Sequence, residues 1–122
     1  MISGAVVANR GPVVPLAVLD AGGRPHAISA LVDTGFNGWL TLPQKLIASL
    51  SLSWYMEGQG ILADGGSTFL NVFAANIVWD GQSCPAFVSE LEGDPLIGMR
   101  LLNGFRIIIE AVAGGAIQIE RL

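Results

Sequence analysis

Short apolar runs separated by glycine and proline residues recur along the whole chain, a rhythm that is typical of an all-β protein. Runs of this length fit strands, because a helix in a globular protein usually needs about ten residues or more. The predicted strands cover Ala5–Ala8, Val13–Leu19, Pro25–Val32, Gly38–Leu42, Ser51–Glu57, Gly58–Ala63, Ser67–Val72, Ala74–Trp79, Ala86–Ser89, Arg106–Glu110 and Ala116–Arg121.

Turn signals between these runs predict hairpins. Asp20-Ala21-Gly22-Gly23 joins the second run to the third, and Gly114-Gly115 joins the last two runs. Asp64-Gly65-Gly66 forms the glycine-rich tip of a hairpin in the middle of the chain. Pro15 interrupts the run Val13–Leu19, which predicts a bend or an edge position, because proline cannot donate a backbone hydrogen bond.

Helices are a minor component of the prediction. Pro43 favours a short helix over Gln44–Leu50, since proline is well placed at a first helical position. A second short helix is expected over Met99–Asn103, with Gly104 just past its end. The acidic segment Glu90–Pro95 is predicted to be a loop.

The composition indicates one domain, residues 1–122, with a real hydrophobic core. A chain of 122 residues buries roughly two-thirds of its unfolded surface. Hydrophobic residues make up 52 % of the chain and charged residues only 13 %, against about 25 % charged in a typical soluble domain. This excess of apolar residues over the needs of one small core favours a buried interface between subunits.

Charge and residue counts exclude several classes of function. A net charge of −4 argues against nucleic acid or an anionic membrane as the main partner. With Cys84 and His26 the only cysteine and histidine, no internal disulfide is possible, and neither a metal nor a cofactor is expected. No apolar run approaches the ~18 residues of a membrane span, and the first residues lack the basic start of a signal peptide, so a cytoplasmic protein is expected.

The most informative stretch is an acidic residue at the end of a strand that reads as fully buried. Asp33-Thr34-Gly35 follows the apolar residues Leu31 and Val32 directly. A carboxylate in such a place costs several kcal/mol unless it is paired or hydrogen-bonded. One interpretation is an Asx-type turn that closes the strand; the other is a functional carboxylate.

Three elements in order along the chain favour the functional interpretation. The first is Leu31-Val32-Asp33-Thr34-Gly35, the second is the glycine-tipped hairpin, and the third is Leu96-Ile97-Gly98 running into the second short helix. In this order the chain resembles the single-domain, retropepsin-like aspartic proteases, and the resemblance spans roughly Val13 to Leu122. The Asp-Thr-Gly motif alone is moderately specific, and the ordered trio is considerably more so.

This resemblance implies a fold, a reaction and a partner. The fold is an all-β closed barrel with a flap hairpin and one or two short helices. The reaction is peptide-bond hydrolysis by a water molecule that a pair of carboxylates activates, without a metal or a cofactor. Since the chain has one Asp-Thr-Gly motif, the second carboxylate has to come from Asp33 of a second chain across a two-fold axis. The expected partners are therefore a second copy and a peptide or protein substrate.

The resemblance also assigns roles to individual residues. Asp33 is the catalytic residue, and Thr34 and Gly35 support the catalytic loop. The flap, about Leu62–Ser67, closes over the substrate. The residues expected to bind substrate are Gly35, Phe36, Leu62, Ala63, Asp64, Gly65, Gly66 and Ile97.

Two residues depart from the commonest family pattern. Phe36 stands where Ser or Ala is frequent, and unlike Ser it cannot hydrogen-bond the carboxylate. Its bulk is expected to narrow or reshape the cleft. Asp64 places a negative charge at the flap tip, near the expected pair of carboxylates, where it would either shift the pH dependence or disfavour acidic substrates.

Two other functions stay open at this point. The chain is alternatively a non-catalytic peptide-binding or scaffold module on the same fold, since a fold does not determine a function. It is also interpretable as a small β-barrel interaction protein in which Asp-Thr-Gly occurs by chance.

Overall fold

The structure, a computed structural model, describes residues 1–61 and 64–122. Strands account for 58 % of the chain and helices for 8 %, which confirms the all-β class. The elements are β1 (Ile2–Val7), β2 (Gly11–Leu19), β3 (Pro25–Val32), β4 (Leu40–Leu42), α1 (Gln44–Ser49), β5 (Ser53–Ile61), β6 (Ser67–Trp79), β7 (Gln82–Glu90), β8 (Leu96–Ile97), α2 (Met99–Leu102), β9 (Phe105–Ile109) and β10 (Ala116–Arg121).

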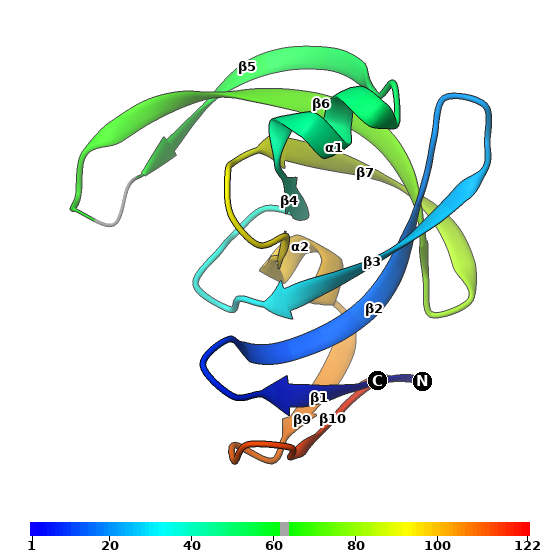
Figure 1. Cartoon of the computed structure of the whole chain (residues 1–122), viewed down its shortest axis with the longest axis vertical. Helices are drawn as coiled ribbons and strands as arrows, with labels where there is room; N and C mark the ends of the chain where they lie inside the picture. Colours follow the sequence, from blue (N-terminus) through cyan, green and yellow to red (C-terminus); the bar gives the residue numbers. More distant parts are fainter. Residues whose placement is uncertain (62–63) are drawn as a thin grey trace.

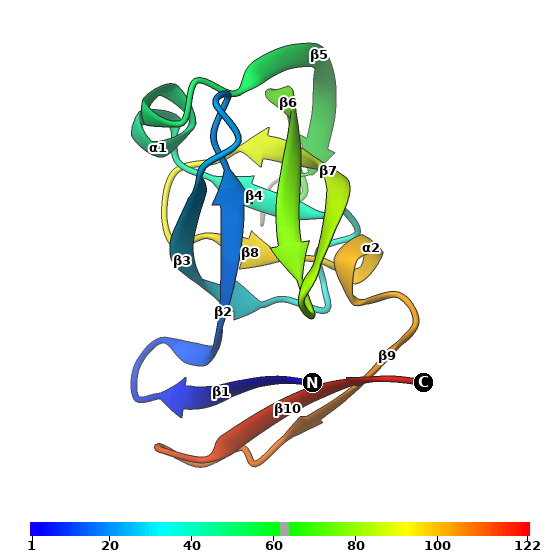
Figure 2. The ribbon, with the colours of Figure 1, turned by 90° about the vertical axis from the view of Figure 1, so that its right-hand side faces the viewer.

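All these strands belong to one hydrogen-bonded sheet with the order β5-β6-β7-β4-β8-β3-β2-β1-β10-β9. Strand β2 has an additional partner, because Ala17–Leu19 pair antiparallel with residues 76–78 of β6. The sheet therefore curls so that β2 meets β3 along one edge and β6 along the other (Figures 1 and 2). The three predicted hairpins, β2–β3, β5–β6 and β9–β10, are all present.

Two of the predicted breaks between strands are absent. The runs Ser51–Glu57 and Gly58–Ala63 belong to one strand, β5, as far as the structure describes them, and β6 is continuous over 13 residues where two strands were expected. A bulge between Trp54 and Met56 disturbs the alternation of side chains in β5. The regular pairing resumes at Met56 and continues through Gly58 to Ile61.

Strand β7 is longer than predicted at both ends. It starts at Gln82 and it includes Glu90, which was expected in a loop. The cause is pairing on both sides, since β7 is antiparallel to β6 and its last residues run parallel to β4. Pro15 is tolerated in β2 because it lies between the stretch that pairs with β1 and the stretch that pairs with β6.

Both predicted helices are confirmed and both are short. Helix α1 has six residues and buries Ile47, while α2 has four and buries Leu101 and Leu102. Over residues 1–61 and 64–122, no helix has the length and apolar character needed to cross a membrane.

The buried side chains form one cluster inside the curled sheet. Its fully buried members include Val14 and Val18 of β2, Leu40 and Leu42 of β4, and Ile97 of β8. Strand β2 contributes the alternate residues Val14, Leu16 and Val18, as expected for a sheet with one face in the core. Consequently the two-residue strand β8 is anchored by a side chain that water does not reach.

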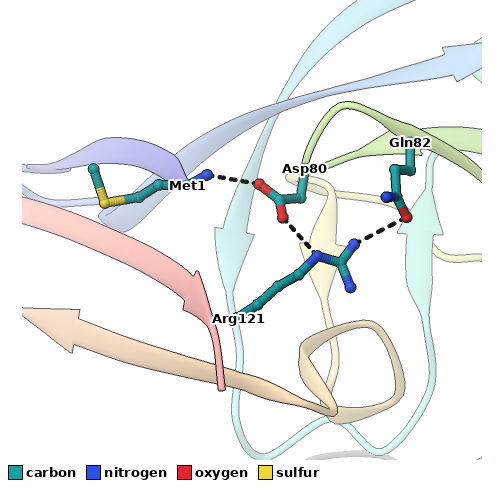
Figure 3. A network of polar contacts seen from close by, with 4 residues as sticks. All are labelled: Met1, Asp80, Gln82 and Arg121. Carbon is teal, nitrogen blue, oxygen red and sulfur yellow. Dashed lines mark hydrogen bonds and ion pairs between the residues drawn. The ribbon is translucent and has the colours of Figure 1, made fainter.

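The first and last strands form a separate layer at one end of the molecule, visible in Figures 1 and 2, where β10 lies between β1 and β9. A polar network ties this layer to the β6–β7 turn (Figure 3). Asp80 accepts hydrogen bonds from the Met1 ammonium at 2.7 Å and from Arg121 Nε at 2.8 Å. Arg121 Nη2 also donates to Gln82 Oε1 at 3.2 Å. One arginine thereby joins β10 to both sides of that turn.

This network should make the stability of the fold sensitive to acid. The hydrogen bond from the Met1 ammonium, followed by that from Arg121, lowers the pKa of Asp80 from its ordinary value of 3.8. The stabilisation is therefore complete above that ordinary value and is lost as pH falls through the lowered pKa of the folded state.

We expect Asp80→Asn to lower Tm at about pH 6 and to converge with the wild type in stronger acid, where Asp80 is protonated in both states. Thermal unfolding across the acidic range measures this difference. Asp94→Asn is the matched control, because its carboxylate forms only an exposed ion pair with Arg10 at 3.3 Å. A Tm difference for Asp80→Asn that does not change with pH would contradict the expectation.

Candidate functional site

The loop after β3, residues 33–39, is held by the short strand β8. Strand β8 runs parallel to β3 and antiparallel to β4, so it lies between the two strands that the loop connects. The Asp33 N–H donates to the Ile97 carbonyl at 2.9 Å, which continues the β3–β8 ladder into the loop. On the other side, Leu96 N–H donates to the buried Thr41 hydroxyl at 2.9 Å. The position of Asp33 is thus determined by backbone hydrogen bonds that start in the core.

The Asp33 carboxylate closes an Asx-type turn. Its Oδ1 accepts the Gly35 N–H at 3.0 Å, and its own carbonyl accepts the Phe36 N–H at 3.1 Å. Asp33 is half-buried, while Thr34 and Gly35 are exposed. A Cβ added to Gly35 would lie 3.3 Å from Oδ1, so any larger residue would crowd the carboxylate. The Asx turn and a functional role for Asp33 are therefore compatible, because the hydrogen bond from Gly35 N–H fixes the carboxylate at the surface of the loop.

Phe36 packs against two glycines that flank the loop. Atoms of its ring would clash with a Cβ at Gly38 and lie within 2.6 Å of a Cβ at Gly98. The Phe36 carbonyl accepts the Met99 N–H at 2.8 Å, and the Gly38 carbonyl accepts the Arg100 N–H at 3.0 Å. The bulk of Phe36 thus joins the loop to the first residues of α2, a contact that the sequence analysis did not foresee.

Ile97, which the resemblance assigns to substrate binding and to support of the catalytic loop, lies beneath the loop in this single chain. Its side chain is fully buried, so it supports the loop from the core and does not reach the surface. Gly98, the next residue, is buried as well, and a Cβ there would clash with the Gly38 carbonyl. The Leu96-Ile97-Gly98 segment therefore supports the loop by packing beneath it.

The tip of the β5–β6 hairpin contains the other residues expected to bind substrate. Leu62 and Ala63 lie outside the described residues. Asp64, Gly65 and Gly66 are exposed, and Asp64 Oδ1 accepts the Gly66 N–H at 2.8 Å. In Figure 1 the hairpin projects beyond the body of the molecule on the left, the side to which the loop after β3 also points. The structure thus places loop and hairpin on one side.

One face of this hairpin carries functional candidates that the sequence analysis missed. On β6, Phe73 packs against the core, so Phe69 and Asn71 lie on the same face, further toward the tip. Trp54 Nε1 donates to Asn71 Oδ1 at 3.1 Å, which places Trp54 on that face too. Alternation within Ser67–Val72 puts Phe69 and Asn71 on one face, but which face is outward and where Trp54 lies depend on the pairing with β5.

A shallow hollow of about 550 Å³ lies beside the loop and is lined by Asn37, Trp39, Met99, Arg100 and Asn103. The Arg100 guanidinium lies over the Trp39 ring, 5.8 Å from its centroid. A second hollow of about 530 Å³ lies at the other end of the molecule, where Met1, Pro15 and Asp80 are among its lining residues. Neither hollow is lined by Asp33, which lies on an open surface of this single chain.

Among the residues that the structure describes, no group of three or more His, Cys, Asp or Glu side chains is arranged to hold a metal ion. No protein-family model matches the sequence, and no curated protein is significantly similar to it.

The packing under the loop yields a test of its rigidity. Gly98→Ala should destabilise the fold by about 1–3 kcal/mol, because the added methyl group meets the Gly38 carbonyl and the Phe36 ring in a packed region. Urea unfolding measures the change. Gly22→Ala serves as the control, since the nearest atom there is the Asp20 carboxylate oxygen, 3.3 Å away in an exposed turn. Equal stability of the two variants would show that the loop is not tightly packed.

Proposed function

We propose that this protein is a homodimeric aspartic endopeptidase in which Asp33 of each chain forms the catalytic pair. The observation that carries the proposal is the position of Asp33: a half-buried carboxylate at the end of a core strand, held by β8, in a loop whose next two residues are exposed. A purely structural Asx turn does not need a two-residue strand inserted behind it. A catalytic carboxylate has to be held in a fixed direction, and the support that β8 gives to the loop supplies this.

The chemistry follows from bringing two such carboxylates together. Two like charges at close range cannot both ionise, so the pair shares one proton. The ionised Asp33 takes a proton from a water molecule, which attacks the scissile carbonyl carbon. The protonated Asp33 donates to the carbonyl oxygen. The newly protonated Asp33 then gives its proton to the departing amine, while the other Asp33 takes a proton from a hydroxyl group of the tetrahedral intermediate. The C–N bond breaks, and the pair again holds one proton.

The surface around the loop supports association of two copies on this side. Thr34 and Gly35 are exposed in the single chain, where they are free to meet their counterparts across a two-fold axis. The turns after β1 and β9 point to the same side as the loop in Figure 1. The apolar side chains at these turns are exposed, Val7 by 39 %, Ile109 by 38 % and Val112 by 65 %. Their burial would supply apolar area for a dimer.

The strand pairings support the retropepsin-like closed barrel that the sequence resemblance implies. From β6 the pairings run through β7, β4, β8 and β3 to β2, and β2 pairs again with β6. In this proposal β5–β6 is the flap hairpin and the layer of β1, β10 and β9 lies outside the barrel.

Replacing the catalytic group gives the first test. Asp33→Asn should abolish cleavage of a diverse peptide mixture, because a neutral amide neither takes a proton from water nor shares one. The dimer should persist or tighten slightly at neutral pH, since like charges are removed from the axis. Mass spectrometry of the mixture measures cleavage, and sedimentation measures the dimer. Glu120→Gln on β10 is the control and should cleave as the wild type does. A variant that only unfolds would point to a structural Asp33.

Mixing the two proteins tests whether the site is shared. If each site needs both carboxylates, adding an equal amount of Asp33→Asn to a fixed amount of wild type should lower activity to about half after subunits exchange, because mixed dimers are inactive. Added Glu120→Gln should instead raise total activity. Unchanged activity after proven exchange of subunits with Asp33→Asn would show that one chain is sufficient.

A peptide-binding module without catalysis is the second candidate, and Phe36 is the observation that favours it. The Phe36 side chain cannot donate a hydrogen bond to the carboxylate, which accepts one from the Gly35 N–H. A folded, dimeric wild type that binds peptides but cleaves none of them would support this candidate.

A further inference from the structure

The hairpin face consists of Trp54, Glu57, Gln59, Phe69 and Asn71, and we propose that it selects peptide segments in which a Lys or Arg adjoins a large apolar side chain. This inference rests on the proposed function, because it describes the substrate class of the same site. It also makes a claim about binding that does not require cleavage.

The composition of the hairpin face follows from the strand register. Glu57 pairs with Asn71 and Gln59 pairs with Phe69 across the β5–β6 ladder, so all four side chains lie on one face. Trp54 joins them through its hydrogen bond to Asn71. Phe73, two residues further along β6, packs against the core on that same side. The hairpin face is therefore the outward continuation of the core-facing side of the sheet.

The two faces of the hairpin differ in how well their apolar groups are covered. On the opposite face, the Leu70 side chain lies over Gly60 and the Val72 side chain over Gly58, where an added Cβ would be 2.7 Å and 3.3 Å away. Aliphatic side chains thus cover the glycines of that face, and Met56, which pairs with Val72 there, is 44 % exposed. On the hairpin face, Phe69 is 71 % exposed and Trp54 is 59 % exposed. Two large aromatic rings are thus available to an occupant.

The negative charge of the hairpin indicates that a bound peptide should carry a positive charge. Between Ser53 and Trp79 the only charged residues are Glu57 and Asp64, and there is no Lys, Arg or His in that stretch. Glu57 is exposed and lies between the two aromatic residues along the hairpin face. Aromatic faces and carboxylates both attract ammonium and guanidinium groups, whereas a carboxylate ligand is repelled. An extended peptide with an apolar side chain next to a cationic one would contact both the aromatic rings and the Glu57 carboxylate.

Peptide binding is measured with the Asp33→Asn variant, so that cleavage of the probe does not affect the result. The probes are three fluorescein-labelled pools of octapeptides with a fixed central Phe-Arg, Phe-Gln or Phe-Glu and random residues elsewhere. Fluorescence polarisation should rank affinity as Arg over Gln over Glu. The Arg pool should bind about two- to fivefold better than the Gln pool at low salt, the range of an exposed charge pair, and this ratio should shrink as salt is added.

Variants of the hairpin face identify the source of the preference. Glu57→Gln should bring the Arg-to-Gln ratio close to one, while Glu120→Gln on β10, the matched control, should leave it unchanged. Phe69→Ala should weaken all three pools and keep the order, because it removes apolar contact without changing charge. The same three pools incubated with wild type report cleavage separately. Ranked binding without cleavage would uphold the inference and refute the proposed protease.

Three results would overturn the inference. Equal affinity for the Arg and Gln pools, or a preference for the Glu pool, would show that the charge of the hairpin face is not used. Absence of binding to every pool would show that peptides do not occupy this face. Dissociation of the dimer by Phe69→Ala would assign the aromatic residues to the contact between two copies instead.

Discussion

The backbone of Leu96 and Ile97 lies between two strands that would otherwise be separated, and the candidate site depends on this insertion. Strand β3 ends at Val32 and β4 begins at Leu40, and β8 pairs with both. The Ile97 carbonyl receives the Asp33 N–H, and the fully buried Ile97 side chain keeps water away from these bonds. Backbone hydrogen bonds in a dry interior are costly to break, because a buried unpaired group loses its full solvation. The direction of one surface carboxylate is therefore maintained by the core.

Above β8, the large ring of Phe36 packs beside two glycines. Gly38 and Gly98 lack side chains where the Phe36 ring lies, and both contribute backbone groups that hydrogen-bond the neighbouring segment. Such a contact stiffens the loop between β3 and β4. It also explains why a Phe directly after Asp-Thr-Gly is compatible with a well-defined loop.

Much of the fold could be predicted from the sequence, and the failures have physical causes. Apolar runs and turn residues located most of the strands and both helices, because those signals are local. The break expected at Gly58 is absent because the Val72 side chain of the neighbouring strand covers that glycine, which only the register reveals. The break expected after Val72 is absent because β6 pairs with β7 across that point. Asp33 could be singled out because a carboxylate after a buried strand is unusual. The packing of Phe36 and the exposure of Trp54 and Phe69 depend on contacts between distant segments, so local patterns did not reveal them.

The pairing of Ile2–Ala5 with Ala116–Ile119 brings the two ends of the chain into one layer. Strand β1 pairs with its neighbour β2 through Ala5–Val7, but its other edge pairs only after residues 116–119 have been made. The core strands β2 to β8 are complete earlier, and the layer that carries Val7 and Ile109 closes afterwards. Contacts between residues so distant in sequence also slow folding, because a long loop has to close before they form. Val7 and Ile109 belong to this layer, so association of two copies through these side chains would follow its closure.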